Sequence, residues 1–126
     1  METWTDQPAD LYDVFARMCP SRSTLERVTG RWGSLILGAL AGGPMRFNEL
    51  RRRVDGISQK ILAQSLQALE RDGFVARNEV STFPMHVEYS LTGSGRAVAE
   101  HLLALFAFLQ AQMPAVLQAQ RDYDNR

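Results

Sequence analysis

Polar side chains suited to reading DNA bases gather between residues 58 and 67. Ser58, Gln59 and Lys60 stand in a row, and Gln64 and Gln67 follow at helical spacing. Glutamine can form two hydrogen bonds with adenine, and lysine can donate to guanine or to phosphate. At the start of a helix, such side chains would meet base edges in the major groove. The pattern also fits the solvated face of an ordinary small helical protein.

This polar row follows a short helix and a tight turn. Asn48 can cap the first helix, because its side-chain oxygen can accept an unpaired backbone N–H. Leu50 and Val54 then lie four residues apart, on one face of that helix. Asp55-Gly56 predicts a helix stop, since glycine tolerates the left-handed backbone of a C-cap.

A second helix is expected from Ser58 to Asp72. Ser58 is a suitable N-cap, and Arg71-Asp72-Gly73 is a typical helix end. The apolar positions recur at helical spacing and comprise Ile61, Leu62, Leu66 and Leu69.

A β-hairpin is expected after Gly73. Residues 74–80 and 85–91 read as two antiparallel strands, with the tip at 81–84. Residues 45–47 could form a short strand that pairs with this hairpin. Arg77 and His86 are candidates for phosphate contacts, although His86 could equally be an ordinary exposed strand histidine.

Apolar helices are expected at both ends of the chain. Residues 8–18 have helical spacing, and this helix would pack on the core or on a partner subunit. Residues 93–119 carry a heptad-like apolar seam that is too wide for a small domain to cover, so a two-fold dimer is the simplest cover. Trp32 is expected in the core. The candidate dimer interface comprises Leu11, Phe15, Val98, Leu102, Leu105, Phe106 and Leu109.

Charge is unevenly distributed along this chain, whose net charge is zero. Residues 17–60 hold nine bases against three acids, whereas residues 1–16 hold four acids and no base. A basic block suits phosphate neutralisation. Arg46, Arg51 and Arg52 within it are candidate DNA contacts.

Several classes of protein are disfavoured by what the sequence lacks. One cysteine excludes an intramolecular disulfide and a multi-thiolate zinc site, and no nucleotide-binding or Ser-His-Asp pattern occurs. We therefore expect no enzyme activity, no metal and no cofactor. No apolar run approaches the ~20 residues of a membrane span, and the N-terminus lacks signal-peptide features. A cytoplasmic protein without membrane contact is expected.

Residues 19–110 resemble the HxlR-type winged-helix regulators of bacteria, within the wider MarR-like group. The resemblance rests on segments in a fixed order, namely Cys19-Pro20, Gly30-Arg31-Trp32, Ile36-Leu37, residues 46–50, 57–60, 66–73 and 87–92, and Gly95-Arg96. Three positions depart from the family pattern. Arg31 replaces a common Lys, Ala63 replaces a common Thr, and Pro84-Met85-His86 replaces a basic wing tip.

The resemblance implies a homodimer that binds a near-palindromic operator in double-stranded DNA. The helix at Ser58–Asp72 would enter the major groove, and the hairpin would flank it as the wing. Members often act as repressors, and several answer electrophiles or oxidants through the cysteine that matches Cys19. Arg17 and Arg22 and a nearby helix start could also activate this thiol, although a buried, inert cysteine is the alternative.

Together these observations predict a mainly α protein with a small β-hairpin wing. Residues 1–126 would form a single winged helix-turn-helix domain, with an N-terminal helix at 8–18, a winged-helix core at 19–92 and a C-terminal dimerisation helix at 93–119. The expected function is that of a dimeric DNA-binding transcriptional regulator. An oxidant or a small-molecule effector could change its DNA binding. The alternatives are a winged-helix protein-interaction module and a small-molecule-binding regulator without thiol sensing.

Overall fold

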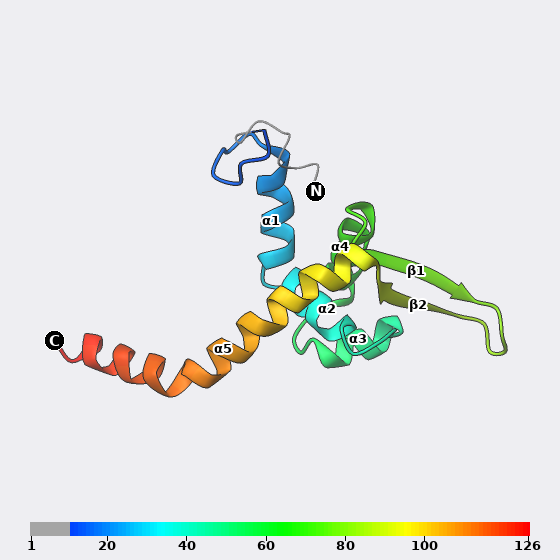
Figure 1. Ribbon diagram of the computed structural model, residues 1–126. Coiled ribbons are helices and arrows are strands. Elements are labelled where there is room, and N and C mark those ends of the chain that lie inside the picture. The colour runs from blue at the N-terminus through cyan, green and yellow to red at the C-terminus, as the bar shows by residue number, and fades with distance from the viewer. Residues whose placement is uncertain (1–10) are drawn as a thin grey trace.

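The computed structural model describes residues 11–126 (Figure 1). Within this range the chain is mainly helical with one antiparallel hairpin, as the sequence predicts. The elements in order are α1 (Pro20–Thr29), α2 (Gly33–Leu40), α3 (Phe47–Arg53), α4 (Gln59–Arg71), β1 (Val75–Val80), β2 (His86–Leu91) and α5 (Gly93–Asp124).

The core is built around α2. Ile36, Leu37 and Leu40 of this helix are fully buried, and α2 contacts each of the four other helices. The surrounding elements contribute further buried side chains, namely Val28, Leu50, Val54, Ile57, Leu62, Leu66, Leu69, Val75 and Leu102. Each fully buried Leu or Ile side chain contributes about 1.5–3 kcal/mol to folding. Trp32 packs against this cluster but is only partly buried.

The hairpin pairs β1 with β2 and projects away from the helices (Figure 1). The pairing runs from Val75 opposite Leu91 to Val80 opposite His86. The expected short strand before α3 is confirmed only as a single bridge. Met45 donates to and accepts from Tyr89 at N–O distances of 2.9 and 2.8 Å, which ties the start of α3 to the hairpin.

The predicted helix at residues 8–18 is wrong over 11–18, while residues 8–10 lie outside the described part. Leu11–Met18 forms turns. The Asp13 carboxylate accepts a bond from the Phe15 N–H at 2.9 Å, and the Arg22 guanidinium donates to the carbonyls of Val14 and Phe15. These side chains satisfy backbone groups that a helix would otherwise pair. The apolar spacing alone was therefore misleading.

The helix starts agree with the sequence at two places and differ at one. Ser58 caps α4 by accepting the Ile61 N–H at 3.1 Å, and Thr92 caps α5 by accepting the Gly95 N–H at 3.1 Å. Asn48 does not cap α3, because the helix already begins at Phe47. The Glu49 carboxylate accepts the Arg46 N–H at 2.7 Å instead. The predicted turn at Gly56 is confirmed, with φ of +90°.

Helix α5 is longer than the predicted 93–119 and continues through Pro114 to Asp124. Its first half crosses the helical body, and its second half bends and extends beyond it (Figure 1). The expectation that no segment is apolar enough for a membrane span is corrected here, since α5 meets that criterion by length and composition alone. A helix that needs a protein partner passes the same test. Large exposed apolar side chains line it, namely Leu103, Leu105, Phe108, Leu109, Met113 and Leu117.

One ion pair joins the end of α1 to the end of α4. The Arg27 guanidinium donates to both carboxylate oxygens of Asp72, with its Nη2 at 3.0 Å from one of them. Asp72 is largely buried, whereas Arg27 is about one-third exposed. The hydrogen bonds to Asp72 raise the pKa of Arg27 above its ordinary value, although burial opposes the shift. This two-pronged contact fixes the C-terminus of α4 against α1.

We expect Asp72→Asn to lower the free energy of unfolding by about 1–3 kcal/mol, because the neutral amide cannot accept both charged donors. Urea unfolding followed by circular dichroism, at one fixed protein concentration, measures the loss. The matched control is Glu79→Gln, which breaks the exposed Arg77–Glu79 pair and should cost about 0–1 kcal/mol. Equal losses in the two variants would contradict a structural role for the Arg27–Asp72 pair.

Candidate nucleic-acid interface

Helix α4 buries one face and exposes the other. Leu62, Leu66 and Leu69 are at most 2% exposed and pack into the core. The predicted base-reading side chains all lie on the exposed part of the helix or at its start, namely Ser58, Gln59, Lys60, Gln64 and Gln67. Because the apolar face is fully used in packing, the polar face is free to meet a nucleic acid without disturbing the core.

Predicted contacts from two helices meet beside the start of α4. Arg51 and Arg52 of α3 and Ser58 and Gln59 at the α4 N-terminus line one polar depression of about 670 Å³. Asn48 lines it as well, a residue that the sequence suggested only as a cap. Backbone N–H groups at a helix N-terminus attract anions. Two guanidinium groups beside such a helix start are suited to a DNA phosphate.

His86 makes more contacts within the folded chain than the sequence suggests. One ring nitrogen, Nδ1, lies 2.8 Å from the Pro84 carbonyl oxygen, and the other, Nε2, lies 2.9 Å from the Glu88 carboxylate. The Arg46 guanidinium also lies 3.2 Å from Nδ1. His86 would therefore have to give up a bond before it could donate to a phosphate. The sequence did not predict that Pro84 and Glu88 would contact His86, since only the folded hairpin brings them to the ring.

These contacts favour the charged form of His86. The Pro84 carbonyl and then the Glu88 carboxylate raise the pKa of His86 above its ordinary value, while the Arg46 charge opposes this. Both hydrogen bonds need an N–H on the ring, and only the imidazolium has two.

The remaining predicted wing contact, Arg77, is exposed on β1. Its guanidinium lies 3.5 Å from the Glu79 carboxylate. An exposed pair at this distance is weak, so Arg77 can turn toward another anion at little cost.

Cys19 immediately precedes α1 and is partly buried. The thiol donates to the Leu11 carbonyl at 3.2 Å, and the Ser21 hydroxyl oxygen lies 3.1 Å from the Cys19 sulfur and 2.9 Å from the Tyr12 carbonyl oxygen. Ser21 was not singled out from the sequence. The thiol thus links the segment before α1 to the helix itself, so a change in its chemistry would break the link to Leu11.

The predicted dimer-interface residues divide into two groups. Leu102 is only 6% exposed, and it packs with Val98 and Phe106 against the core of its own subunit. These three therefore serve mainly inside the subunit, because α5 lies across α2. Leu11, Phe15, Leu105 and Leu109 remain between 43% and 87% exposed. Only this second group stays fully available to a partner.

A possible metal site has no support in the described part of the chain. No group of three or more His, Cys, Asp or Glu side chains among residues 11–126 could hold a metal ion.

Comparison with known proteins gives consistent matches. A family model described as HxlR-like helix-turn-helix matches residues 27–116. The HTH-type transcriptional regulator YtfH of Escherichia coli (strain K12) is 53% identical over 110 residues, which cover 87% of this chain and 86% of that protein.

Solved structures agree with these matches. The transcriptional regulator ytfH from Salmonella typhimurium has a TM-score of 0.79 and 52% identity, covering 87% of this chain and 97% of that one. The redox regulator HypR in its reduced form has a TM-score of 0.69 and 32% identity, covering 79% of this chain and 98% of that one.

The His86 contacts lead to a pH prediction. A raised pKa means that the His86 contacts stabilise the hairpin below the ordinary pKa of histidine and lose this effect as pH rises through the raised value. An NMR titration of the ring should therefore show a midpoint above that of an ordinary histidine. Glu88→Gln should move the midpoint downward. An unshifted midpoint in the wild type, or one that Glu88→Gln leaves in place, would contradict these contacts.

Proposed function

Since the chain belongs to the HxlR-like helix-turn-helix family of DNA-binding transcription regulators, we propose that it acts as a homodimeric repressor on a near-palindromic operator. The observation that carries this proposal is the exposed polar face of α4 beside Arg51 and Arg52. A protein that regulates transcription in this way would work in the cytoplasm of a bacterial cell.

Each subunit would place the N-terminal half of α4 in the major groove. Gln59 and Lys60 would read base edges, Gln64 and Gln67 would follow along the groove, and Ser58 would hold the helix start. Arg46, Arg51 and Arg52 would contact phosphates beside the helix. Arg77 on the hairpin would contact the backbone further along the duplex, and His86 would orient the hairpin more than it would bind DNA.

The second subunit would cover the exposed apolar part of α5. Leu105 and Leu109 are 48% and 46% exposed, and Phe108 is 60% exposed. A patch of this kind marks an interaction surface. Two copies related by a two-fold axis would present two α4 helices, and half-sites one or more helical turns apart would match them. Leu11 and Phe15 would add to the interface from the segment before α1.

Cys19 would make DNA binding sensitive to oxidants. With one cysteine per chain, an oxidant of the diamide type can accept two thiol hydrogens while two Cys19 sulfurs form a disulfide between subunits. A small thiol could instead supply the second sulfur. Either bond would remove the thiol hydrogen that now reaches the Leu11 carbonyl. The segment before α1, and with it the spacing of the two α4 helices, would then shift.

Gln59→Ala tests the base-reading role. The probe is the duplex from upstream of the protein's own gene that the wild type binds most tightly. Binding of the variant to this duplex should be weaker by about 1–3 kcal/mol, because two hydrogen bonds to a base are lost. Binding to a scrambled duplex should stay unchanged. The control is Gln118→Ala on α5, which should alter neither. Fluorescence anisotropy measures all of these affinities, and equal losses on both duplexes would refute base reading by Gln59.

Cys19→Ser tests the thiol role. Diamide should release the wild type from its operator and yield a species twice the subunit mass on a non-reducing gel, unless a small thiol caps the cysteine. The serine variant should stay bound under the same treatment, because it lacks a sulfur to oxidise. If the serine variant is released as readily as the wild type, Cys19 is not the sensor.

A further inference from the structure

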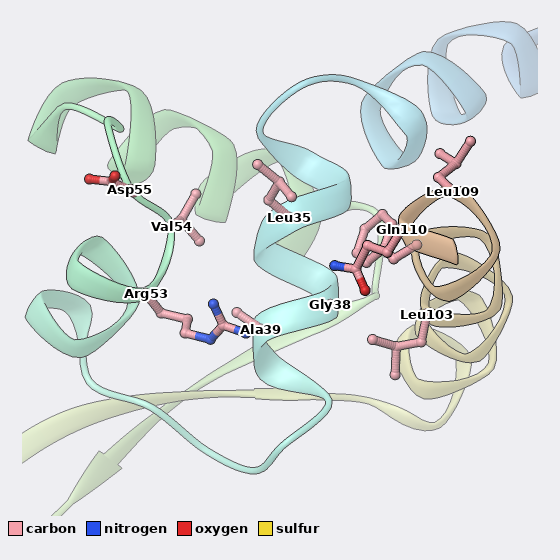
Figure 2. Close-up of a pocket in the computed structure, with 10 residues that line it drawn as sticks. Leu35, Gly38, Ala39, Arg53, Val54, Asp55, Leu103, Leu109 and Gln110 are labelled. Atoms are coloured by element: carbon pink, nitrogen blue, oxygen red, sulfur yellow. The ribbon is translucent and has the colours of Figure 1, made fainter. Parts of the chain in front are cut away.

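The exposed polar face of α4 has a depression on each side. On the α3 side, Arg51 and Arg52 line the polar depression beside the start of α4. Figure 2 shows the neighbouring Arg53 reaching toward Ala39 of α2, so this third arginine lines a different hollow. On the other side of α4, Arg31 lines a depression of about 310 Å³. A cation therefore lies on both sides of the face that would read bases.

Helix geometry places the two depressions on opposite sides of that face. At about 100° per residue, Ala68 lies about 180° around α4 from Gln59, and Gln67 lies about midway between them. Gln59 lines the depression on the α3 side, and Ala68 lines the one beside Arg31. A helix with its side chains is about 10–12 Å across, and the major groove is about 12 Å wide. The two sides of α4 would therefore face the two backbones that wall the groove, and each backbone belongs to one DNA strand.

Stacking on Trp32 holds the exposed Arg31 side chain in place. The guanidinium carbon lies 4.5 Å from the centroid of the indole ring, which attracts the cation to its face. Trp32 itself packs against the core, and a Cβ at Gly56, in the turn before α4, would lie 3.9 Å from its Cη2 atom. Stacking occupies the face of the guanidinium, whereas its N–H groups point outward in the plane. Arg31 is therefore oriented without using up its hydrogen-bond donors.

Two glycines hold the segment that carries Arg31 close to the end of α1. A Cβ at Gly30 would lie 2.7 Å from the Glu26 carbonyl oxygen, and one at Gly33 would overlap the Arg27 carbonyl oxygen. Only residues without a side chain allow this close approach of the two backbones. Arg31 thus has a backbone position fixed by α1 as well as a side chain oriented by stacking.

The charges around Arg31 favour an anion. Arg31 takes part in none of the salt bridges among residues 11–126. Among the described residues, no Asp or Glu lines its depression, and the Arg27 guanidinium that also lines it already donates to Asp72. The neutral polar side chains of Gln64 and Ser65 line the α4 side. A guanidinium with free N–H groups in such surroundings suits a phosphate oxygen.

We propose that Arg31 binds a DNA backbone phosphate on the strand opposite the one that Arg51 and Arg52 meet. This inference rests on the proposed function. Arg31 holds one wall of the major groove, and the two arginines of α3 hold the other. A phosphate contact carries no base preference of its own, but it fixes the register of a protein on the duplex. Arg31 therefore positions the base-reading side chains of α4 from the side that α3 does not reach.

The first test removes single charges from the full-length protein. Fluorescence anisotropy over a series of salt concentrations measures binding to the duplex used for Gln59→Ala and to its scrambled counterpart. Arg31→Gln should weaken binding to both duplexes by a similar factor, roughly fivefold or more at low salt, because each subunit loses a charge-assisted contact. The slope of log affinity against log salt concentration should become shallower by about 1 for each subunit. Arg31→Lys should keep the slope, because it keeps the charge.

Two control variants separate this inference from the proposed function. Arg52→Gln removes a charge on the α3 side and should show the same two effects. Arg121→Gln removes the same charge from the far end of α5 and should show neither. If Arg52→Gln weakens binding and flattens the slope but Arg31→Gln does not, the Arg31 contact is overturned while the proposed function stands. If neither of these two variants has an effect, the proposed function fails as well.

A second test assigns the strand. Each phosphate of the duplex is replaced in turn by an uncharged methylphosphonate, and the loss of affinity is measured for the wild type and for Arg31→Gln. One position should weaken the wild type but not the variant, because the variant already lacks that contact. The position that Arg52→Gln makes silent in the same way should lie on the other strand, across the major groove. The proposal is overturned if no position depends on Arg31, or if both positions lie on one strand.

Discussion

The apolar contact between α2 and the inner face of α4 is the interaction on which the rest of the structure depends. Ile36, Leu37 and Leu40 are fully buried against a set that includes Leu62, Leu66 and Leu69. Because α4 buries its whole apolar face in this contact, its polar face points to solvent in one fixed orientation. The same central helix carries the first half of α5 on another side. One core therefore positions both the candidate DNA-reading surface and the helix that would form a dimer.

Polar contacts at the two ends of α4 refine that orientation. At the start, the turn at Gly56 and the Ser58 cap set where the helix begins. At the end, Arg27 of α1 donates a hydrogen bond to the Asp72 carboxylate. The segment beside Cys19 leads directly into α1, so a change at that thiol has a short physical route to α4.

Local sequence signals predicted the elements that local chemistry decides. Ser58, the apolar spacing of α4 and the glycines at 56 and 73 specify a helix between two turns, and the structure places α4 within one residue of the expectation. The hairpin could be predicted equally well, because apolar and polar residues alternate along its strands. The segment before α1 was not, because helical spacing at Leu11 and Phe15 was overridden by Arg22 and Asp13, which bind the backbone there.

Contacts between distant parts of the chain were beyond the sequence. Arg27 and Asp72 are 45 residues apart, and Arg46 and His86 are 40 apart. Neither spacing carries a local pattern, so only the packing of the elements reveals these pairs. The division of α5 between core and exposed surface had the same origin. The heptad-like spacing predicts that both Leu102 and Leu105 take part in packing. Only the position of α2 decides that Leu102 is buried and Leu105 is not.

The measurement that tests the central claim most directly is selection of DNA from a random duplex library by the purified protein, followed by sequencing of the bound fraction. If two α4 helices read base edges from a symmetric dimer, the bound DNA should be enriched in two inverted half-sites. Their centres should lie about 10 base pairs, or a multiple of that distance, apart. A bound fraction no different from the starting library would contradict sequence reading by α4. Enrichment of one isolated half-site would contradict the dimer.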